Sequence, residues 1–87
     1  MCTYITEKIS ATGSGKGADG WFGLSETTVY FDHPVHTHAD HTLNIDFRDP
    51  SRGPSARVAV ELTADTARAL AEAILRTLDS APADLLV

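Results

Sequence analysis

The hydrophobic pattern of this chain changes its period once, and that change predicts the fold class. Through residues 27–62, apolar residues recur at every second position within each run, the spacing of a β-strand with one buried face. After Thr63 they recur at the spacing of one helical stripe, at Ala67, Leu70, Ala71, Ile74 and Leu78. The pattern predicts an α+β protein, with an antiparallel sheet of four to five strands packed against one C-terminal helix.

Capping and turn-forming residues set the boundaries of the expected elements. Thr63 is a good helix N-cap and Pro82 follows the helical pattern, so a helix is expected over about residues 64–80. Residues 13–20 (GSGKGADG) predict a flexible connection, because glycine loses the most conformational freedom on ordering. Strands are expected at about residues 4–11, 21–24, 27–33, 41–48 and 57–62 of a single domain that spans residues 1–87.

Composition limits the classes of function. The net charge of −5 and the scattered Lys and Arg residues argue against nucleic-acid binding, which needs a basic surface. No apolar run is long enough to span a bilayer, and the N-terminus lacks the features of a secretory signal. We therefore expect a soluble cytoplasmic protein. Cys2 is the one cysteine, so no intramolecular disulfide can form.

The small size of the chain predicts a need for further stabilisation. A chain of 87 residues buries only roughly 60–65% of its unfolded surface. A metal ion or a partner subunit can supply stability that a small core lacks. The edges of so small a sheet are also open, so a homo-oligomer is expected, most simply a homodimer. The apolar C-terminal residues 84–87 (DLLV) can contribute to such an interface.

The two clearest strands predict their own pairing register. If they form an antiparallel hairpin with Phe31 opposite Leu43, their apolar residues make one continuous face. The other face of the same hairpin then places Glu26 opposite Arg48, a favourable pair of opposite charges. A shift by one residue would turn the apolar residues to solvent, so the register is well specified.

All four histidines lie in the segment DHPVHTHADH that joins these strands. In the predicted register His33 lies opposite His41, with Cβ atoms roughly 4.5–5.5 Å apart. Two imidazoles at that spacing can bind one divalent transition metal, namely zinc, iron, nickel or copper. His36 and His38 in the loop are candidate third ligands. So is Glu7, a carboxylate between two isoleucines of the first strand that is costly to bury unless it binds something.

The flanking carboxylates extend this hypothesis beyond the ligands. Metal-bound histidines usually donate their second ring N–H to an acceptor, and Asp32 and Asp40 are the candidates here. An open position on the metal would lower the pKa of a bound water to about 7, which permits hydrolase, lyase or isomerase chemistry.

Two other functions fit the same sequence. A metal-free enzyme or small-molecule binder would use His33 or His41 as a general acid or base, with Asp32 or Glu7 adjusting its pKa. The aromatic residues Trp21, Phe22 and Tyr30 would then line the ligand pocket. Alternatively, the chain is a non-catalytic module that forms homo-oligomers through a sheet edge or its C-terminal residues.

Three segments of the sequence carry a resemblance to other proteins. The start MCTY, the segment FDHPVH and the end VAVELTADTARALAEAI resemble small uncharacterised actinobacterial proteins. The resemblance spans most of the chain. It implies no activity, cofactor or functional residue.

Overall fold

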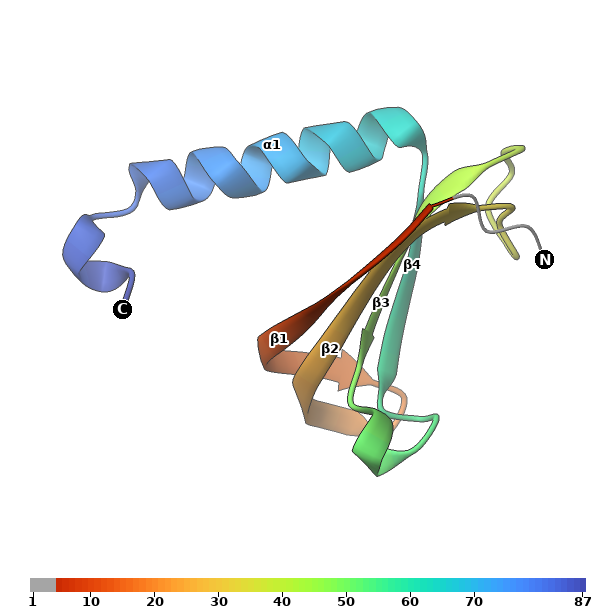
Figure 1. The fold of residues 1–87 in the computed structure, drawn as a ribbon, viewed down its shortest axis with the longest axis horizontal. Coiled ribbons are helices and arrows are strands. Elements are labelled where there is room, and N and C mark those ends of the chain that lie inside the picture. The colour runs from red at the N-terminus through yellow and green to blue at the C-terminus, as the bar shows by residue number, and fades with distance from the viewer. Residues whose placement is uncertain (1–4) are drawn as a thin grey trace.

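The computed structural model describes residues 5–87, which form one antiparallel sheet followed by a long helix (Figure 1). Each strand pairs with the next one in sequence, in the order β1-β2-β3-β4, so the predicted α+β architecture is confirmed with four strands. The predicted strand start at Tyr4 lies outside the described residues. The elements are β1 (Ile5–Gly17), β2 (Gly20–Asp32), β3 (Thr42–Arg48), β4 (Arg57–Leu62), α1 (Ala64–Ser80) and two short 3-10 turns, Pro50–Arg52 and Ala83–Leu85.

The β2–β3 hairpin has the register that the alternation predicts. Phe31 pairs with Leu43, and the pairing continues without a shift to Glu26 opposite Arg48. The Glu26 carboxylate lies 3.9 Å from the Arg48 guanidinium. Strand β4 pairs with β3 in a register that continues both faces of the sheet. The apolar face carries Val29, Phe31, Leu43, Ile45, Val60 and Leu62, and the polar face carries Tyr30, Asp32, Asn44, Asp46, Arg57 and Glu61.

The prediction of a flexible glycine-rich connection is wrong. Residues 13–17 form the second half of β1 and pair with residues 20–24 of β2. The segments 21–24 and 27–33, expected as separate strands, are therefore parts of one strand. A β-bulge between Ser10 and Gly13 bends the long β1–β2 hairpin, and its tip curls toward the start of β4 (Figure 1).

Close packing at the curled tip explains why glycine occupies these strand positions. A Cβ atom at Gly15 would lie 3.2 Å from a Leu24 methyl carbon and 3.4 Å from a Val58 methyl carbon. A Cβ atom at Gly17 would lie 3.2 and 3.3 Å from the main-chain oxygens of Ser55 and Arg57. The glycines therefore permit β1 to approach β4, a role that strand propensity does not reveal.

The helix α1 has the predicted boundaries. The Thr63 hydroxyl accepts a hydrogen bond from the Thr66 N–H at 3.4 Å, which caps the first turn. At the other end the Ala81 N–H donates to the Leu78 carbonyl, and Pro82 follows. No helix in the described part of the chain combines the length and the hydropathy that crossing a bilayer requires.

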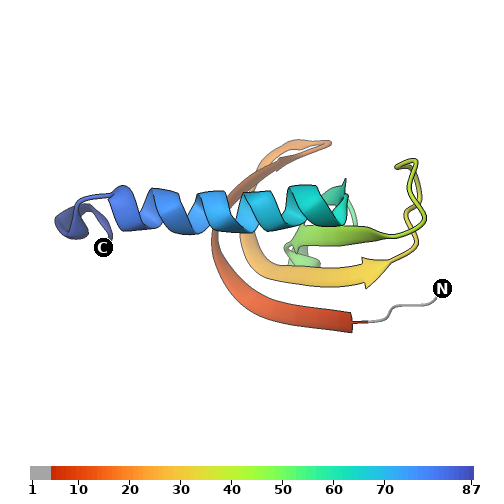
Figure 2. The same cartoon turned by 90° about the horizontal axis from the view of Figure 1, so that it is seen from above.

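The helix lies over the apolar face but diverges from it. It leaves the end of β4 and passes across the strands, and its C-terminal half projects beyond β1 (Figures 1 and 2). An open wedge of about 470 Å³ separates the helix from the sheet, with Phe31 and Leu43 on one side and Leu70 and Ile74 on the other. The apolar face of one chain is therefore only partly covered by its own helix.

Candidate functional site

The His33 and His41 rings lie side by side where the β2–β3 hairpin opens into its loop. Their ring centres are 4.5 Å apart and their planes are tilted by 33°. The half-buried His41 ring also stacks on Phe31, with ring centres 5.7 Å apart. Phe31 belongs to the apolar face, so the end of that face supports the histidine pair. The hairpin register thus brings together the two histidines that the sequence places opposite each other.

Two contacts hold His33 in this position. Its Nδ1 atom lies 3.1 Å from the main-chain oxygen of Asp40. A carbonyl oxygen can only accept, so Nδ1 carries a proton in this contact and Nε2 is the nitrogen through which the ring could bind a metal ion. Asp32 is only 1% exposed, and its carboxylate accepts a hydrogen bond from the backbone N–H of His33 at 2.6 Å. Asp40 therefore acts through its main chain, not through the side chain that the sequence suggested.

The loop that carries the other histidines is anchored by Glu61 of β4. The Glu61 carboxylate accepts three main-chain N–H groups, from Val35 at 2.5 Å, His36 at 3.1 Å and Thr37 at 2.9 Å. The hydrogen bonds from Val35 and Thr37 lower the pKa of Glu61 from 4.5 to about 2, with a smaller contribution from His36. Three donors on one carboxylate fold the loop back over the polar face of the sheet.

This anchor predicts an acid-sensitive loop. The folded pKa of Glu61 lies below its unfolded value, so its contribution to stability is present above pH 4.5 and is lost as the pH falls toward 2. We expect Glu61→Gln to lower the melting temperature by several degrees at pH 7, and the difference to disappear near pH 2. Melting curves followed by circular dichroism between pH 7 and 2 measure this. Glu72→Gln on the exposed side of α1 is the control, and parallel curves for Glu61→Gln and the wild type would contradict the anchor.

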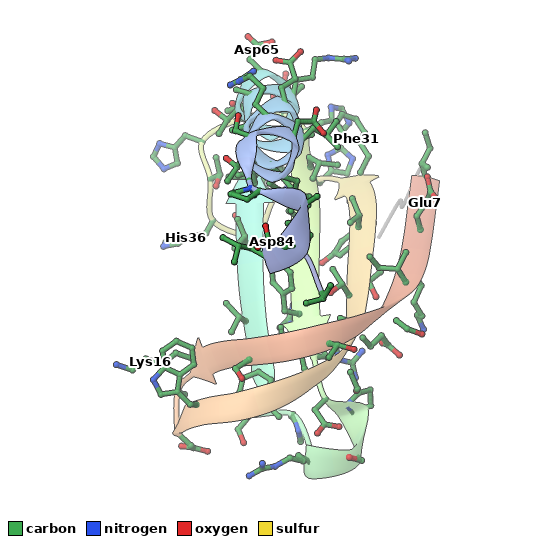
Figure 3. The ribbon with its side chains drawn as sticks, turned by 90° about the vertical axis from the view of Figure 1, so that its left-hand side faces the viewer. Glu7, Lys16, Phe31, His36, Asp65 and Asp84 are labelled. Atoms are coloured by element: carbon green, nitrogen blue, oxygen red, sulfur yellow. The ribbon has the colours of Figure 1, made fainter. Side chains whose placement is uncertain are left out.

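The other predicted ligands do not join the histidine pair. The His36 side chain points away from the sheet on one side of the molecule, and Glu7 lies on exposed β1 on the other side from His36 (Figure 3). His38 is exposed in the loop. Within residues 5–87, no group of three or more His, Cys, Asp or Glu side chains is arranged to hold a metal ion. Cys2 lies outside the described residues.

Beneath the anchored loop, the polar face of the sheet forms a pocket of about 460 Å³. Asn44 lines it, and the Thr42 hydroxyl donates to the Asn44 side-chain oxygen at 2.6 Å, with both residues at most 5% exposed. Buried Asp32 and exposed His33 are also among the residues that line this pocket. Of the two paired histidines, His33 contributes to this pocket and His41 does not line it.

A second polar cluster lies further along the pocket. Tyr30 donates to one oxygen of Asp46 at 3.3 Å, and Arg57 donates to the other at 2.9 Å. Burial raises the pKa of the Tyr30 phenol above 10.0, and the charge of Asp46 raises it further. No local motif in the sequence marks Asp46, Arg57 or Glu61 as site residues. Strand alternation places them on the same face of the sheet as Tyr30. The pocket on that face, however, forms only because residues 35–37 fold over it.

Of the three aromatic residues expected to form one pocket, Trp21 and Phe22 line one small cavity and Tyr30 lies apart from them. Trp21 is 71% exposed near the tip of the β1–β2 hairpin. Phe22 is buried beside Ala56, and both line a small cavity of about 80 Å³. Tyr30 lines the polar pocket instead. Of the three, Tyr30 lies near the histidines.

Comparison with known proteins places the chain in a family without assigning it an activity. No curated protein and no solved structure is detectably similar to it. One family model matches the chain over residues 1–87, from end to end. The chain therefore belongs to the family of unknown function DUF6295.

Proposed function

We propose that this protein binds a divalent transition metal through His33 and His41. The observation that carries the proposal is the orientation of His33, whose Nδ1 lies 3.1 Å from the Asp40 carbonyl oxygen, so that metal binding would fall to Nε2. Histidine ligands of metal sites usually have this arrangement, because an acceptor on the second nitrogen fixes the tautomer and the ring direction.

The spacing of the two rings supports the same proposal. Two imidazoles that bind one ion at about 2.0–2.1 Å, with an angle between a right angle and a tetrahedral one, have centres roughly 4.5–5 Å apart. The His33 and His41 ring centres are 4.5 Å apart. The buried carboxylate of Asp32 and the anchor at Glu61 restrain the first half of the segment, so this half loses little conformational freedom on binding.

Two histidines leave coordination positions for water or for further ligands. Zinc, iron, nickel and copper all accept imidazole ligands, so the donors favour this group of metals over magnesium or calcium. A bound metal would supply Lewis acidity and an acidic water at the end of the hairpin. We place this activity in the cytoplasm, whose reducing conditions suit the single thiol of Cys2.

The test is elemental analysis of untagged protein that has been purified without added metal or chelator. We expect close to one zinc, iron, nickel or copper ion per chain, and loss of that metal in the His33→Ala, His41→Ala double variant. The His36→Ala, His38→Ala variant is the matched control, because it removes two histidines of the same loop and should retain metal. A Cys2→Ser variant tests whether the thiol completes the ligand set.

Removal of the metal should also lower stability, because a ligand that binds only the folded state stabilises it. At a free ion concentration about 100 times the dissociation constant, the expected stabilisation is about 2.7 kcal/mol. Protein that contains far less than one ion per chain, and whose melting temperature does not change when these ions are added, would refute the proposal.

The polar pocket favours one alternative, a metal-free binder of a small polar molecule. Its carboxylates, Arg57 and Tyr30 converge on a space of about 460 Å³, within the range of small-molecule sites. In that function His33 acts as an acid or base at the mouth of the pocket. Ligand binding that persists in the presence of a chelator distinguishes this function from the metal-dependent one.

A further inference from the structure

The described part of the chain buries very few apolar side chains. Within residues 5–87, Phe22 and Ala56 are the apolar residues that are buried, each 7% exposed, and both lie at the curled end of the sheet. The middle of the apolar face, opposite the helix, remains open to the wedge. A single chain therefore lacks the packed centre on which the stability of a small domain usually depends.

The uncovered apolar residues form two facing surfaces. On α1, Leu70, Ile74 and Leu78 lie on one stripe and are 42%, 51% and 50% exposed. On β1, Ile5 and Ile9 point from the apolar face and are 66% and 60% exposed. These side chains are exposed because the helix lifts away from the sheet as it crosses β1 (Figures 1 and 2). Such an apolar surface, contributed by both a helix and a sheet, marks an interaction site.

We propose that a second copy of this chain occupies the wedge, so that the helix of each copy packs in the wedge of the other. The area supports a partner of this size. A compact chain of 9.3 kDa is expected to expose about 5,000 Å², whereas this chain exposes 6521 Å². The excess of about 1,500 Å² per chain corresponds to the larger, mostly obligate, dimer interfaces.

The dimensions of the chain lead to the same conclusion. Its radius of gyration is 14.4 Å, whereas a compact domain of this length has one of about 12 Å. The shape has a protruding ridge, the helix, and a matching hollow, the wedge. A two-fold axis places the ridge of each copy in the hollow of the other, which forms a closed pair without further free surfaces of this kind.

Charges at the interface also fit a second copy. Arg68 of α1 lines the wedge, and Glu7 lies on the same face of β1 between Ile5 and Ile9. A two-fold arrangement brings the helix of one copy over β1 of the other, so an arginine of the partner can pair with Glu7. A carboxylate on a covered face needs a partner. An arginine of the second copy would supply this partner for Glu7.

Other occupants fit the surface less well. A small apolar molecule can fill a wedge of about 470 Å³, but Ile5, Ile9 and Leu78 do not line it and would stay in water. A membrane is disfavoured because helices that lie on membranes carry a basic polar face. The polar residues of α1 include two arginines but also three acidic residues, Asp65, Glu72 and Asp79.

The test is the mass of the wild-type protein in solution, measured by sedimentation equilibrium over a wide concentration range. We expect twice the chain mass of 9.3 kDa at micromolar concentrations, and a melting temperature that rises with protein concentration. A wild-type protein that stays monomeric at all concentrations overturns the proposal.

Two substitutions locate the interface. Ile9→Lys should raise the dimer dissociation constant at least about 100-fold, because a two-fold interface loses the side chain twice. Since Ile9 is 60% exposed in the single chain, a lysine there displaces no buried residue of its own chain. Ile74→Glu tests the helix side. The matched controls, Ser10→Lys on the other face of β1 and Ala69→Glu on the other side of α1, should remain dimeric.

These variants leave His33 and His41 unchanged, so the dimer proposal and the metal proposal can fail separately. A dimer that neither Ile9→Lys nor Ile74→Glu weakens would form through another surface, such as a sheet edge, and would refute the wedge as the interface. A dimer dissociated by either control to the same extent would also refute it, because the effect would then not depend on the apolar surfaces.

Discussion

Replacement of Asp32 by alanine is expected to lower the free energy of unfolding by about 2–4 kcal/mol. Asp32 is 1% exposed, and its carboxylate accepts the His33 N–H at 2.6 Å. The alanine variant leaves that donor without its acceptor and opens space beside Thr42, which is fully buried. A domain of this size has a total stability of only about 4–13 kcal/mol. The loss is therefore a large part of the whole.

Asp40→Ala is the control for this prediction. Asp40 is exposed, and its contact with His33 is made by its main-chain oxygen, which the substitution retains. Its free energy of unfolding should change by less than about 0.5 kcal/mol. Urea denaturation of both variants and of the wild type measures the difference. Equal effects of the two substitutions would show that burial of Asp32 contributes nothing specific to this segment.

The second large effect is expected at Gly17, where the tip of the β1–β2 hairpin packs on the start of β4. A Cβ atom there would lie 3.1 Å from the Phe22 ring, besides its short distances to two main-chain oxygens. Main-chain atoms cannot move aside as a flexible side chain can. We expect Gly17→Ala to destabilise the protein by about 1–3 kcal/mol through this overpacking.

Gly23 provides a matched control on the paired strand. A Cβ atom at Gly23 has nothing within 4 Å, and its backbone does not adopt a positive φ. Gly23→Ala should be neutral or stabilising by up to about 1 kcal/mol, because it reduces the freedom of the unfolded chain. The midpoint of denaturation should therefore fall for Gly17→Ala and stay the same or rise for Gly23→Ala. Equal destabilisation would indicate that glycine is needed along the hairpin for a reason other than close packing.

Local patterns were sufficient to predict the centre of the fold. The alternation of apolar and polar residues specified the pairing of Phe31 with Leu43, because a shift of one residue exchanges the two faces of a strand. The helix boundaries followed from Thr63 and Pro82, which act on their immediate neighbours. The adjacency of His33 and His41 is a consequence of the same register. Each of these results depends on residues that are close in the chain or paired within one hairpin.

The glycine-rich half of β1 could not be recognised in this way. Glycine has a low strand propensity, and the reason for its presence at Gly17 lies near Ser55 and Arg57, far along the sequence. The approach of these segments depends on the bulge after Ser10 and on the curvature of the whole hairpin. A property that emerges from accumulated curvature is not visible in any short window of sequence.

In the candidate site, too, local sequence patterns predicted some features and long-range contacts decided others. The sequence by itself determined which residues share a face and which two histidines meet at the end of the hairpin. Only the tertiary structure showed that Glu61 anchors the loop through Val35, and that the apolar face is left partly uncovered. Periodicity reports the side on which a residue lies, because it arises from local backbone geometry. What covers that side depends on contacts between distant segments, which are decided only when the chain, or a pair of chains, is folded.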